Sequence, residues 1–514
     1  MLKQIPSQVL AVVEEIEKAG FEAFFVGGCV RDLLIGKNPK DWDVTTKATP
    51  QQIIAIFPDS FYENNFGTVG IKVLPFGEDA TLEPKKEHSI VEVTTYRIES
   101  AYSDRRRPDE VKFALTLAED LSRRDFTMNA IALKISNEKM PARIRKSSGE
   151  VGNAPCSMLH APAFEFVDLF GGQKDIKNKL IRAVGDANAR FNEDALRIIR
   201  AIRFHSQLGF EIETTTLEAL QKNAGLISFV ANERIKDELT KIILSENPAA
   251  GIDLMQKTGV LKVALPELEA GVGIAQNRHH IFTIYQHCLL SLKHCPSKKL
   301  EVRLAALFHD IAKPQTKRGE GTFSTFYNHD HLGARIVKKM LSRLKFSNEV
   351  IDKVVLLVDN HMFYYNPEEV GEASVRRLIK KVGLGNVKDL IDLRIADRLG
   401  SGTPKGKPYK LRHLEYLIEK VSKDAVSVKM LKINGNDLMQ DLGLAPGPKI
   451  GAILDVLLAE VIEDAQKNQC ELLLTRAKDL DSEDLSKLRQ MAKEVIEEKK
   501  EEDEQEIKGK HWVK

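Results

Sequence analysis

Strand periodicity is confined to the beginning of this chain, and helical periodicity fills nearly all of the rest. Apolar spacing predicts a helix over residues 7–18. Strand-like segments follow at residues 21–26, 68–74, 90–96, 111–113 and 130–135. Beyond Asp168, Leu, Ile and Ala recur with helical spacing to about Lys478. We therefore expect an α+β protein, with a small N-terminal mixed α/β head followed by an extended, mostly α-helical body.

The length of 514 residues is too great for a single hydrophobic core, so several domains are expected. Two polar, turn-rich stretches, 76–89 and 136–163, have the composition of loop insertions on the head. The stretch 400–408 is rich in Gly, Pro and Lys, as linkers are. The predicted domains are a head at 1–170, a helical neck at 171–270, a third domain at 271–400, a helical domain at 401–480 and a charged, disordered tail at 481–514.

The composition, 43% hydrophobic and 29% charged, is that of a globular protein. No apolar run is long enough to span a bilayer, and the first residues lack the apolar core of a signal peptide. The five cysteines are odd in number and form no Cys-x-x-Cys pair, which favours a reducing cytoplasm. Because the net charge is only +2, any contact with nucleic acid must come from local patches.

A glycine pair closes an apolar strand near the N-terminus, and two carboxylates follow it. Gly27 and Gly28 lie in the run FVGGCVRD, where glycine lets the backbone come close to a ligand, as in turns that cradle phosphate. Asp41 and Asp43 are one residue apart, so in a strand both would lie on one face and could hold Mg²⁺. Each motif alone is common in ordinary turns and loops. Together, in this order, they indicate nucleotidyl transfer from a nucleoside triphosphate.

This combination resembles the class II tRNA nucleotidyltransferases, or CCA-adding enzymes, and their poly(A) polymerase relatives. The resemblance implies that Asp41 and Asp43 are catalytic metal ligands. It implies a nucleotide site that includes Gly27, Gly28, Arg31 and Asp32.

A two-metal mechanism usually needs a third carboxylate, and Glu92 is the candidate on a later strand. A charged residue in such a strand is often only solvated. The matching glutamate of the family belongs to the metal site, so the resemblance makes Glu92 catalytic.

Three consecutive arginines, Arg105, Arg106 and Arg107, follow in the run YSDRRRPD. In isolation this is a basic loop. It is similar to the flexible-loop motif of the family, Tyr-x-Asp-x-Arg-Arg-Pro, so we expect these side chains to contact RNA phosphates.

Residues 120–130, DLSRRDFTMNA, resemble a family motif almost throughout. The planar fork of an arginine binds phosphate oxygens in pairs. Arg123 and Arg124 are therefore expected to bind the triphosphate.

Residues 190–204 are predicted to form one amphipathic helix, with Asp194 and Arg197 on one face. Such a pair is ordinarily an ion pair within a helix. The alternative is a protein template for a base, because cytosine and adenine both present an amine beside a ring-nitrogen acceptor, which complements a carboxylate beside a guanidinium. Guanine and uracil would place a carbonyl against the carboxylate. CTP and ATP are therefore the expected substrates, as the Glu-Asp-x-x-Arg motif of the family also implies.

Arg200 and Arg203 continue the basic face of this helix and are expected to reach phosphate or sugar. Residues 232–235, NERI, resemble a further family motif. There we expect a structural salt bridge that supports the helix.

A second group of candidate ligands lies in the third domain. His287, His309, Asp310 and Asp397 have the order His…His-Asp…Asp, which resembles the divalent-metal ligands of the HD phosphohydrolase family. His329 and His361 match the extra histidines that can hold a second metal. Imidazole with carboxylate suits Mn, Fe, Ni or Zn. The domain is either a hydrolase of 2′,3′-cyclic or terminal phosphates on RNA ends, or a relic in which these residues only hold helices together.

Residues 443–451 open a later helix with glycines, prolines and Lys449. Chemistry alone allows a phosphate contact or a plain turn. Bacterial CCA-adding enzymes carry a similar run where they grip the tRNA body, so Lys449 is expected to bind RNA.

The sequence thus predicts a cytoplasmic, Mg²⁺-dependent enzyme that adds CCA to the 3′ end of tRNA from CTP and ATP, without membrane contact. Residues 171–270 would select the base, 271–400 would be the HD domain, and 401–480 would bind tRNA. The alternatives are an A-adding or CC-adding specialist, a poly(A) polymerase, or an HD metal phosphohydrolase whose head only docks RNA.

Overall fold

The computed structural model describes residues 4–62, 67–76, 88–100, 110–136, 163–277, 281–403, 405–423 and 431–513. The chain divides into two compact units. The N-terminal unit comprises Met1–Val272 and Lys339–Ile351, and the C-terminal unit comprises Gly273–Lys338 and Asp352–Lys514. Arg105, Arg106, Arg107 and most of the two expected insertions lie outside the described residues. None of the described helices has both the length and the apolar character that a membrane crossing needs.

The head is built on a seven-stranded sheet in the order β3-β4-β5-β2-β1-β8-β9. Its strands are β1 (Ala23–Val26), β2 (Asp43–Thr46), β3 (Ser60–Tyr62), β4 (Thr68–Val73), β5 (Ser89–Thr95), β8 (Ala132–Ser136) and β9 (Ala163–Val167). Strands β2 and β5 pair in parallel, whereas the other neighbours are antiparallel. Short separate sheets join β6 (Arg97–Ser100) to β7 (Glu110–Phe113), and β10 (Leu180–Ile181) to β11 (Glu211–Ile212). The five predicted strand segments correspond to β1, β4, β5, β7 and β8.

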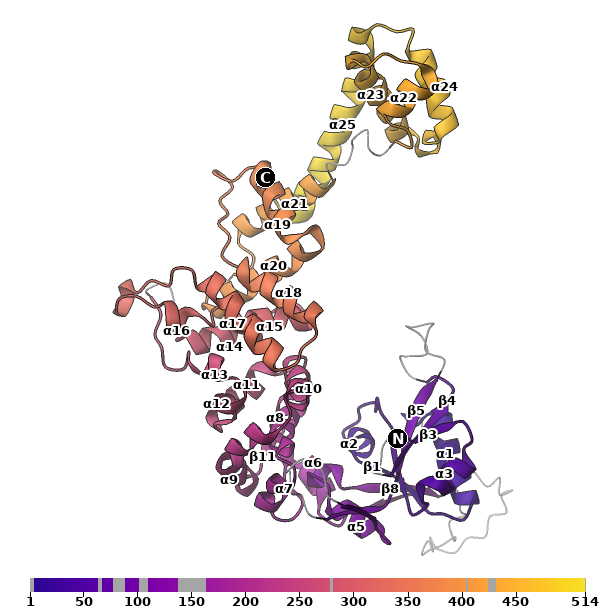
Figure 1. Cartoon of the computed structure of the whole chain (residues 1–514), viewed down its shortest axis with the longest axis vertical. Helices are drawn as coiled ribbons and strands as arrows, with labels where there is room; N and C mark the ends of the chain where they lie inside the picture. The colour runs from indigo at the N-terminus through magenta and orange to yellow at the C-terminus, as the bar shows by residue number, and fades with distance from the viewer. Residues whose placement is uncertain are drawn as a thin grey trace, which may run out of the picture. The chain divides into compact units, whose positions relative to one another are not determined.

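Helices complete the head. They are α1 (Ser7–Lys18), α2 (Gly28–Leu34), α3 (Pro50–Ile56), α5 (Leu117–Ser122) and the 3₁₀ helix η2 (Thr127–Asn129). Helix α1 spans the predicted residues, because Val9, Val12, Val13 and Ile16 recur on one face and are all buried. Helix α3 begins at a capping box in which Thr49 and Gln52 satisfy each other's backbone N–H groups. Helices α1 and α3 contact each other and the strands of the sheet (Figure 1).

The rest of the N-terminal unit is helical. Its elements are α6 (Gly172–Lys177), α7 (Ala187–Glu193), α8 (Leu196–Leu208), α9 (Thr214–Asn223), η3 (Ala224–Phe229), α10 (Asn232–Ile243), α11 (Pro248–Lys257), α12 (Val260–Ala264) and α13 (Pro266–Glu269). Helix α8 is central, because it packs on both α10 and α11. Its apolar residues Ile198, Ile199 and Ile202 are fully buried.

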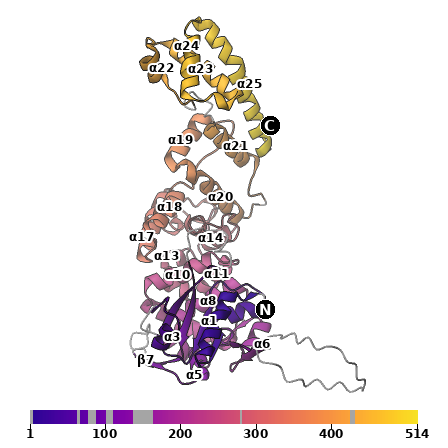
Figure 2. The same cartoon turned by 90° about the vertical axis from the view of Figure 1, so that its right-hand side faces the viewer.

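The described residues after Gly273, which include Lys339–Ile351 of the N-terminal unit, form helices and no β-strand. They are α14 (Ile284–Lys293), α15 (Leu300–Phe308), α16 (Lys313–Thr316), η4 (Gly321–Phe323), α17 (His329–Arg343), α18 (Asn348–Asp359), α19 (Glu372–Val382), α20 (Leu384–Gly400), α21 (Tyr409–Lys423), α22 (Gly435–Leu442), α23 (Pro448–Glu463), η6 (Ala465–Lys467), α24 (Cys470–Leu480) and α25 (Leu485–His511). Helix α20 packs on α14 and α15, and α23 packs on α24 and α25 (Figures 1 and 2). The predicted fold class is confirmed.

The expectation of a disordered tail at 481–514 is wrong, because α25 continues as a helix to His511. Near its end Ile507 and Val513 are buried in an apolar cluster with α21. Glu504 accepts hydrogen bonds from Tyr416 and Lys420 of α21, each at 2.7 Å. This segment has few large apolar residues, but two of them, Ile507 and Val513, are buried by tertiary contacts.

Candidate active site and metal centre

Two of the predicted catalytic carboxylates lie side by side on neighbouring strands, and the third, Asp41, lies two residues before the start of β2. Asp43 opens β2 and is the register partner of Glu92 on β5, so both side chains leave the sheet on one face. Trp42 is buried and meets Phe25 edge-on at 5.7 Å, so it points into the core. Because side chains alternate along an extended chain, Asp41 and Asp43 are directed away from that core. Asp43 is half-buried, whereas Asp41 and Glu92 are exposed.

A tight turn brings the backbone against this carboxylate group. Gly27, between β1 and α2, has φ of +82°, a conformation that favours glycine. A Cβ added there would lie 3.2 Å from Asp43 Oδ2 and 3.2 Å from Arg124 Nη1. Burial raises the pKa of Asp43, with Asp41 adding to the shift and Arg124 opposing it. A cation beside Asp41 and Asp43 would relieve this cost, and paired carboxylates are hard oxygen ligands of the kind Mg²⁺ prefers.

The two arginines expected at the triphosphate are held by one buried carboxylate. Asp120 has no exposed side-chain surface and pairs with Arg123 at 2.7 Å and with Arg124 at 3.1 Å. Burial alone would raise the pKa of Asp120, but the two guanidinium groups outweigh it and lower this pKa. The sequence analysis assigned Asp120 no role. Its spacing of three and four residues from the arginines was the available signal.

Arg31 is fixed in a similar way. Its guanidinium donates to Asn129 Oδ1 at 2.8 Å and to Asp32 Oδ1 at 2.7 Å. Asp32 therefore orients Arg31. Gly28 lies next to the same guanidinium, because a Cβ added at Gly28 would be 3.7 Å from Arg31 Nη2.

The prediction of one continuous helix over 190–204 is wrong, because the chain breaks at Asp194. Helix α7 ends at Glu193 and α8 begins at Leu196, with Asp194 extended at φ −136°. Asp194 Oδ1 accepts the backbone N–H of Leu196 at 3.0 Å, a bond that competes with helix continuation. Both Asp194 oxygens also accept from Arg234, at 3.1 and 2.8 Å. This is the structural salt bridge expected of the 232–235 motif.

The basic face of α8 is largely matched by carboxylates. Arg197 donates to Glu193 at 2.7 Å and, through Nη2, to the carbonyl oxygen of Arg123 at 3.0 Å. The second contact links the residues expected to select the base to those expected to bind the triphosphate. The other two arginines pair with carboxylates that the sequence analysis did not identify: Arg200 with Asp125 at 2.6 and 2.8 Å, and Arg203 with Glu238 at 3.0 Å. These carboxylates are distant in sequence from their partners, so no local spacing pointed to them.

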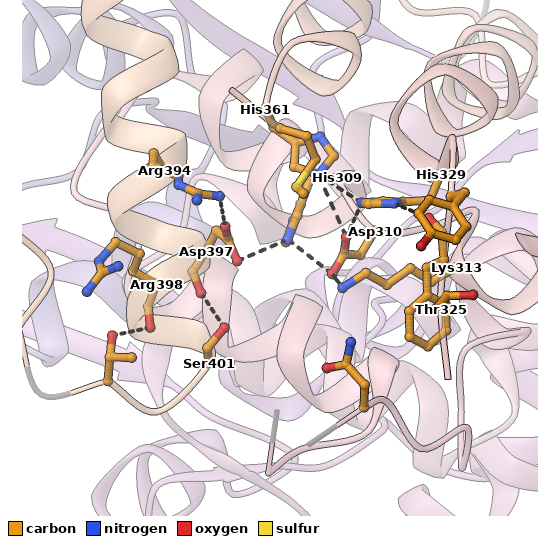
Figure 3. Close-up of a pocket in the computed structure, with 15 residues that line it drawn as sticks. His309, Asp310, Lys313, Thr325, His329, His361, Arg394, Asp397, Arg398 and Ser401 are labelled. Atoms are coloured by element: carbon orange, nitrogen blue, oxygen red, sulfur yellow. Dashed lines mark hydrogen bonds and ion pairs between the residues drawn. The ribbon is translucent and has the colours of Figure 1, made fainter. Parts of the chain in front are cut away.

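The C-terminal unit brings all six predicted metal ligands into one cluster. Figure 3 shows five of them, all except His287. His287 Nε2 lies 2.9 Å from His309 Nε2, 3.2 Å from Asp310 Oδ2 and 3.4 Å from Asp397 Oδ1. On the other oxygen of Asp310, His329 Nε2 lies at 3.3 Å and His361 Nε2 at 3.8 Å. Asp310 therefore stands between two groups of ligands, as a bridging carboxylate between two metals would.

The hydrogen bonds of three histidines aim their free nitrogens at this centre. The Nδ1–H of His309 donates to the carbonyl of Ala306 at 3.0 Å, and those of His329 and His361 donate to the carbonyls of Phe326 and Val358, each at 2.6 Å. In a neutral ring this leaves the lone pair on Nε2. Metal-bound histidines usually have this outer hydrogen bond, so the residues fit a divalent transition metal.

The electrostatics of the cluster also call for a cation. Burial lowers the pKa of His309 to about 3. Burial also opposes a charge on His287, but Asp310 and Asp397 outweigh it and raise the pKa of His287 to about 9. Lys313, another residue that the sequence analysis left unassigned, contacts Asp310 Oδ2 at 2.6 Å. A proton and an ammonium group thus supply positive charge that a metal ion would otherwise provide.

The cluster of predicted metal ligands borders a cavity of about 600 Å³, which we call the metal cavity. Its wall includes five of the six predicted ligands, all except His287, together with Lys313, Arg394 and Arg398. Arg394 donates to Asp397 Oδ2 at 2.9 Å.

Three family models match parts of the chain. They are the poly A polymerase head domain at residues 23–144, the probable RNA and SrmB-binding site of polymerase A at 209–271, and the putative tRNA nucleotidyltransferase domain 2 at 326–477. The CCA-adding enzyme of Limosilactobacillus reuteri (strain DSM 20016) is 30% identical, over 94% of this chain and 99% of that protein. The CCA-adding enzyme of Lactiplantibacillus plantarum is 31% identical, over 93% and 98%.

This chain belongs to the CCA-adding enzyme family. Its fold is also similar to the crystal structure of the Bacillus stearothermophilus CCA-adding enzyme in complex with CTP, with a TM-score of 0.55 and 24% identity, covering 93% of this chain and 97% of that one. CCA-adding enzymes are metal-dependent nucleotidyltransferases, typically using Mg²⁺.

The remaining predicted site residue of this family member is Lys449. It lies at the start of α23, where its ammonium group pairs with Asp481 Oδ1 at 3.1 Å and with the carbonyl of the same residue. About 40% of its side-chain surface is exposed. The pair holds the start of α23 to the end of α24 and leaves part of the ammonium group accessible.

Proposed function

We propose that this chain adds C, C and A to the 3′ end of tRNA, using CTP and ATP. The observation that carries the proposal is the pairing of Asp43 with Glu92 across β2 and β5, next to Asp41 and opposite the Gly27 turn and Arg124. Carboxylates that could hold a cation thus face a guanidinium that could hold a phosphate.

Asp41 and Asp43 would hold Mg²⁺, with Glu92 completing the site. When bound, Mg²⁺ neutralises phosphate charge and favours the deprotonated form of the attacking hydroxyl. The 3′ oxygen of the RNA attacks the α-phosphorus, and the bond from this phosphorus to the pyrophosphate oxygen breaks. Arg123 and Arg124 would orient the triphosphate for this in-line geometry, because Asp120 fixes both guanidinium groups.

Base selection would use Asp194 and Arg197. A carboxylate offers about four acceptor positions, of which Arg234 takes two and the N–H of Leu196 takes one. One position remains for the exocyclic amine of cytosine or adenine. The contact from Arg197 to the Arg123 carbonyl would then couple the choice of base to the position of the triphosphate.

The test uses tRNA transcripts that end at the discriminator base, at C or at CC, with Mg²⁺ and each nucleotide singly or CTP with ATP. Ordered addition of C, C and A, with GTP and UTP refused, is the expected result. Addition of A alone to the CC end would make the chain an A-adding specialist. No incorporation on any primer would overturn the transferase proposal.

A second function is favoured by the six-ligand cluster of the C-terminal unit. We propose that this cluster binds two divalent transition metals and hydrolyses 2′,3′-cyclic or terminal phosphates on RNA ends. His287, His309, Asp310 and Asp397 would hold the first metal, and Asp310, His329 and His361 the second. Lys313 would neutralise phosphate charge.

Hydrolysis of RNA ending in a 2′,3′-cyclic phosphate, measured with Mn²⁺, Ni²⁺ or Zn²⁺, tests this second function. Loss of hydrolysis in His309→Ala and its retention in Asp41→Ala are expected. The opposite pattern, or no hydrolysis with any metal, would leave the cluster with only a structural role.

A further inference from the structure

A second cavity lies beside the metal cavity in the C-terminal unit. Its volume is about 410 Å³. The lining residues are Phe363, Tyr365, Arg394, Arg398, Pro408, Tyr409, Lys410 and Leu411. Arg394 and Arg398, one turn apart on α20, line both cavities. A ligand that fills both spaces would therefore pass these two guanidinium groups.

The walls of this second cavity have the chemistry of a nucleobase site. Phe363, Tyr365 and Tyr409 supply three aromatic rings, and planar bases stack on such rings whatever their identity. The Arg394 guanidinium lies 5.7 Å from the centre of the Phe363 ring. The Tyr365 hydroxyl is 2.5 Å from His413 Nδ1, which fixes the orientation of that ring. Tyr409 has 43% of its surface exposed and stands at the rim.

Arg398 is placed between the two cavities without a counter-ion. Its Nε is buried and has no hydrogen-bond partner, and no carboxylate among the described residues pairs with its guanidinium. Figure 3 shows a contact from the Arg394 guanidinium to Asp397 and none from the Arg398 guanidinium. Arg398 as a whole is half-buried, so its guanidinium can meet a ligand in either cavity. A guanidinium without a counter-ion at a cavity wall can bind an anion, and phosphate is an anion that arginine binds through paired hydrogen bonds.

We infer that this second cavity binds the base of a terminal nucleotide whose phosphate lies in the metal cavity. Arg398 pairs with that phosphate, and Tyr409 and Phe363 enclose the base. The inference rests on the proposed hydrolase function, and it names the substrate class as nucleotide 2′- or 3′-phosphates, including RNA ends. In the reaction water attacks phosphorus, the bond from phosphorus to the ribose oxygen breaks, and that oxygen leaves with a proton.

The test is photolabelling of the full chain with 8-azidoadenosine 3′-phosphate, with CTP present to occupy the transferase site. We expect label in peptides that contain residues 363–365 or 408–411. Tyr409→Ala should reduce this label about tenfold, a loss typical of removing one base stack. Arg398→Ala should also reduce it about tenfold, because the phosphate loses a charge-assisted hydrogen bond. Tyr364→Ala is the matched control, because Tyr364 is exposed, bonds to Glu369 and does not line the cavity. Label confined to the N-terminal unit, or unchanged in Tyr409→Ala, would overturn the inference.

Hydrolysis separates this inference from the function on which it rests. The metal-loaded chain should cleave adenosine 3′-phosphate with a lower KM than glycerol 2-phosphate, a substrate that has no base. Tyr409→Ala should bring the two KM values closer together, because it removes a ring that stacks on the base. Equal KM values for both substrates would overturn the base site while the hydrolase function stands. Cavity labelling without hydrolysis of either substrate would support the base site and overturn the hydrolase function.

Discussion

Asp43 and Glu92 are register partners on the parallel strands β2 and β5, so two carboxylates distant in sequence leave the sheet side by side. Asp43 Oδ2 and Arg124 Nη1 each lie 3.2 Å from the position that a Cβ would take at Gly27. This relationship joins the metal-binding and phosphate-binding halves of the proposed transferase site, and the first predictions test it.

Asp43→Asn removes a proposed metal ligand while keeping its shape. We expect nucleotide addition to fall at least about 100-fold, as it does when a group that stabilises transition-state charge is lost. Stability should stay the same or rise, because burial disfavours the ionised carboxylate. Steady-state incorporation of CMP and thermal unfolding measure the two effects. Asp59→Asn is the control, since Asp59 is an exposed carboxylate of the head; full activity of Asp43→Asn would contradict the assignment.

Gly27→Ala separates backbone strain from crowding of the site. Gly20 has φ of +88° with nothing within 4 Å of an added Cβ, whereas the Cβ at Gly27 would lie 3.2 Å from Asp43 and Arg124. Both Gly27→Ala and Gly20→Ala should lower the free energy of unfolding by about 1 kcal/mol, because alanine is strained at positive φ. Only Gly27→Ala should also lose nucleotide addition. Denaturant unfolding and incorporation assays are the measurements, and equal activity of the two variants would contradict close approach at Gly27.

Asp194→Asn replaces one carboxylate oxygen with an amide NH2 group, so the acceptor for the base becomes a donor. Addition of GMP or UMP relative to CMP should rise by about tenfold, because one wrong-base contact is worth about 1–3 kcal/mol. Arg234→Gln removes the partner of Asp194 without changing the proposed base edge. Arg234→Gln should lower kcat/KM for CTP and ATP alike and leave the preference for these nucleotides over GTP and UTP unchanged. Incorporation of each nucleotide supplied singly measures both effects. If Asp194→Asn selects nucleotides as the wild type does, Asp194 is not part of a base template.

The two ligand groups around Asp310 predict two metal ions per chain. His361→Ala should lower the content to about one ion, because it removes a ligand of the second group only. His331→Ala should leave the content unchanged, since the exposed His331 bonds to Asp359 outside the cluster. Elemental analysis after dialysis against Mn²⁺ measures the content. Wild-type chain without bound metal under these conditions would show that the cluster is structural.

The end of α25 should detach from α21 in acid. Hydrogen bonds from Lys420 and Tyr416 lower the pKa of Glu504 from 4.5 to about 2. A carboxyl group with a lowered pKa in the folded state stabilises that state above its unfolded pKa. The stabilisation is therefore present above about pH 4.5 and is lost as the pH falls towards 2. The anisotropy of Trp512 fluorescence should fall in this range, and Glu504→Gln should flatten the change; identical profiles would contradict the role of Glu504.

Local features of the structure could be predicted from sequence because their causes are local. The spacing of Val9, Val12 and Ile16 sets α1 whatever lies nearby. The sequence could predict that one site contains Gly27, Asp41 and Asp43. The position of Gly27 depends only on the turn after β1, and those of the two aspartates depend only on the start of β2. The strand segments could be located by their alternation, although their order in the sheet could not.

Residues 190–204, the proposed base-selecting region, show where sequence alone was insufficient. Helical periodicity across 190–204 predicted one helix. Asp194 interrupts it, because its carboxylate accepts the backbone N–H of Leu196 and pairs with Arg234 on another helix. The basic face of α8 likewise predicted that Arg200 and Arg203 reach phosphate or sugar. Asp125 and Glu238 neutralise two of them, and these partners meet only after the chain has folded.

The sequence by itself determined the head-and-helices fold class, the family, and the types of residue at both candidate sites. Only the tertiary structure decided that Asp310 stands between two ligand groups, that Arg398 lies between two cavities, and that α25 docks on α21. The physical reason is range: periodicity and turn chemistry act over a few residues, whereas ion pairing, burial and cavity shape depend on which distant segments meet.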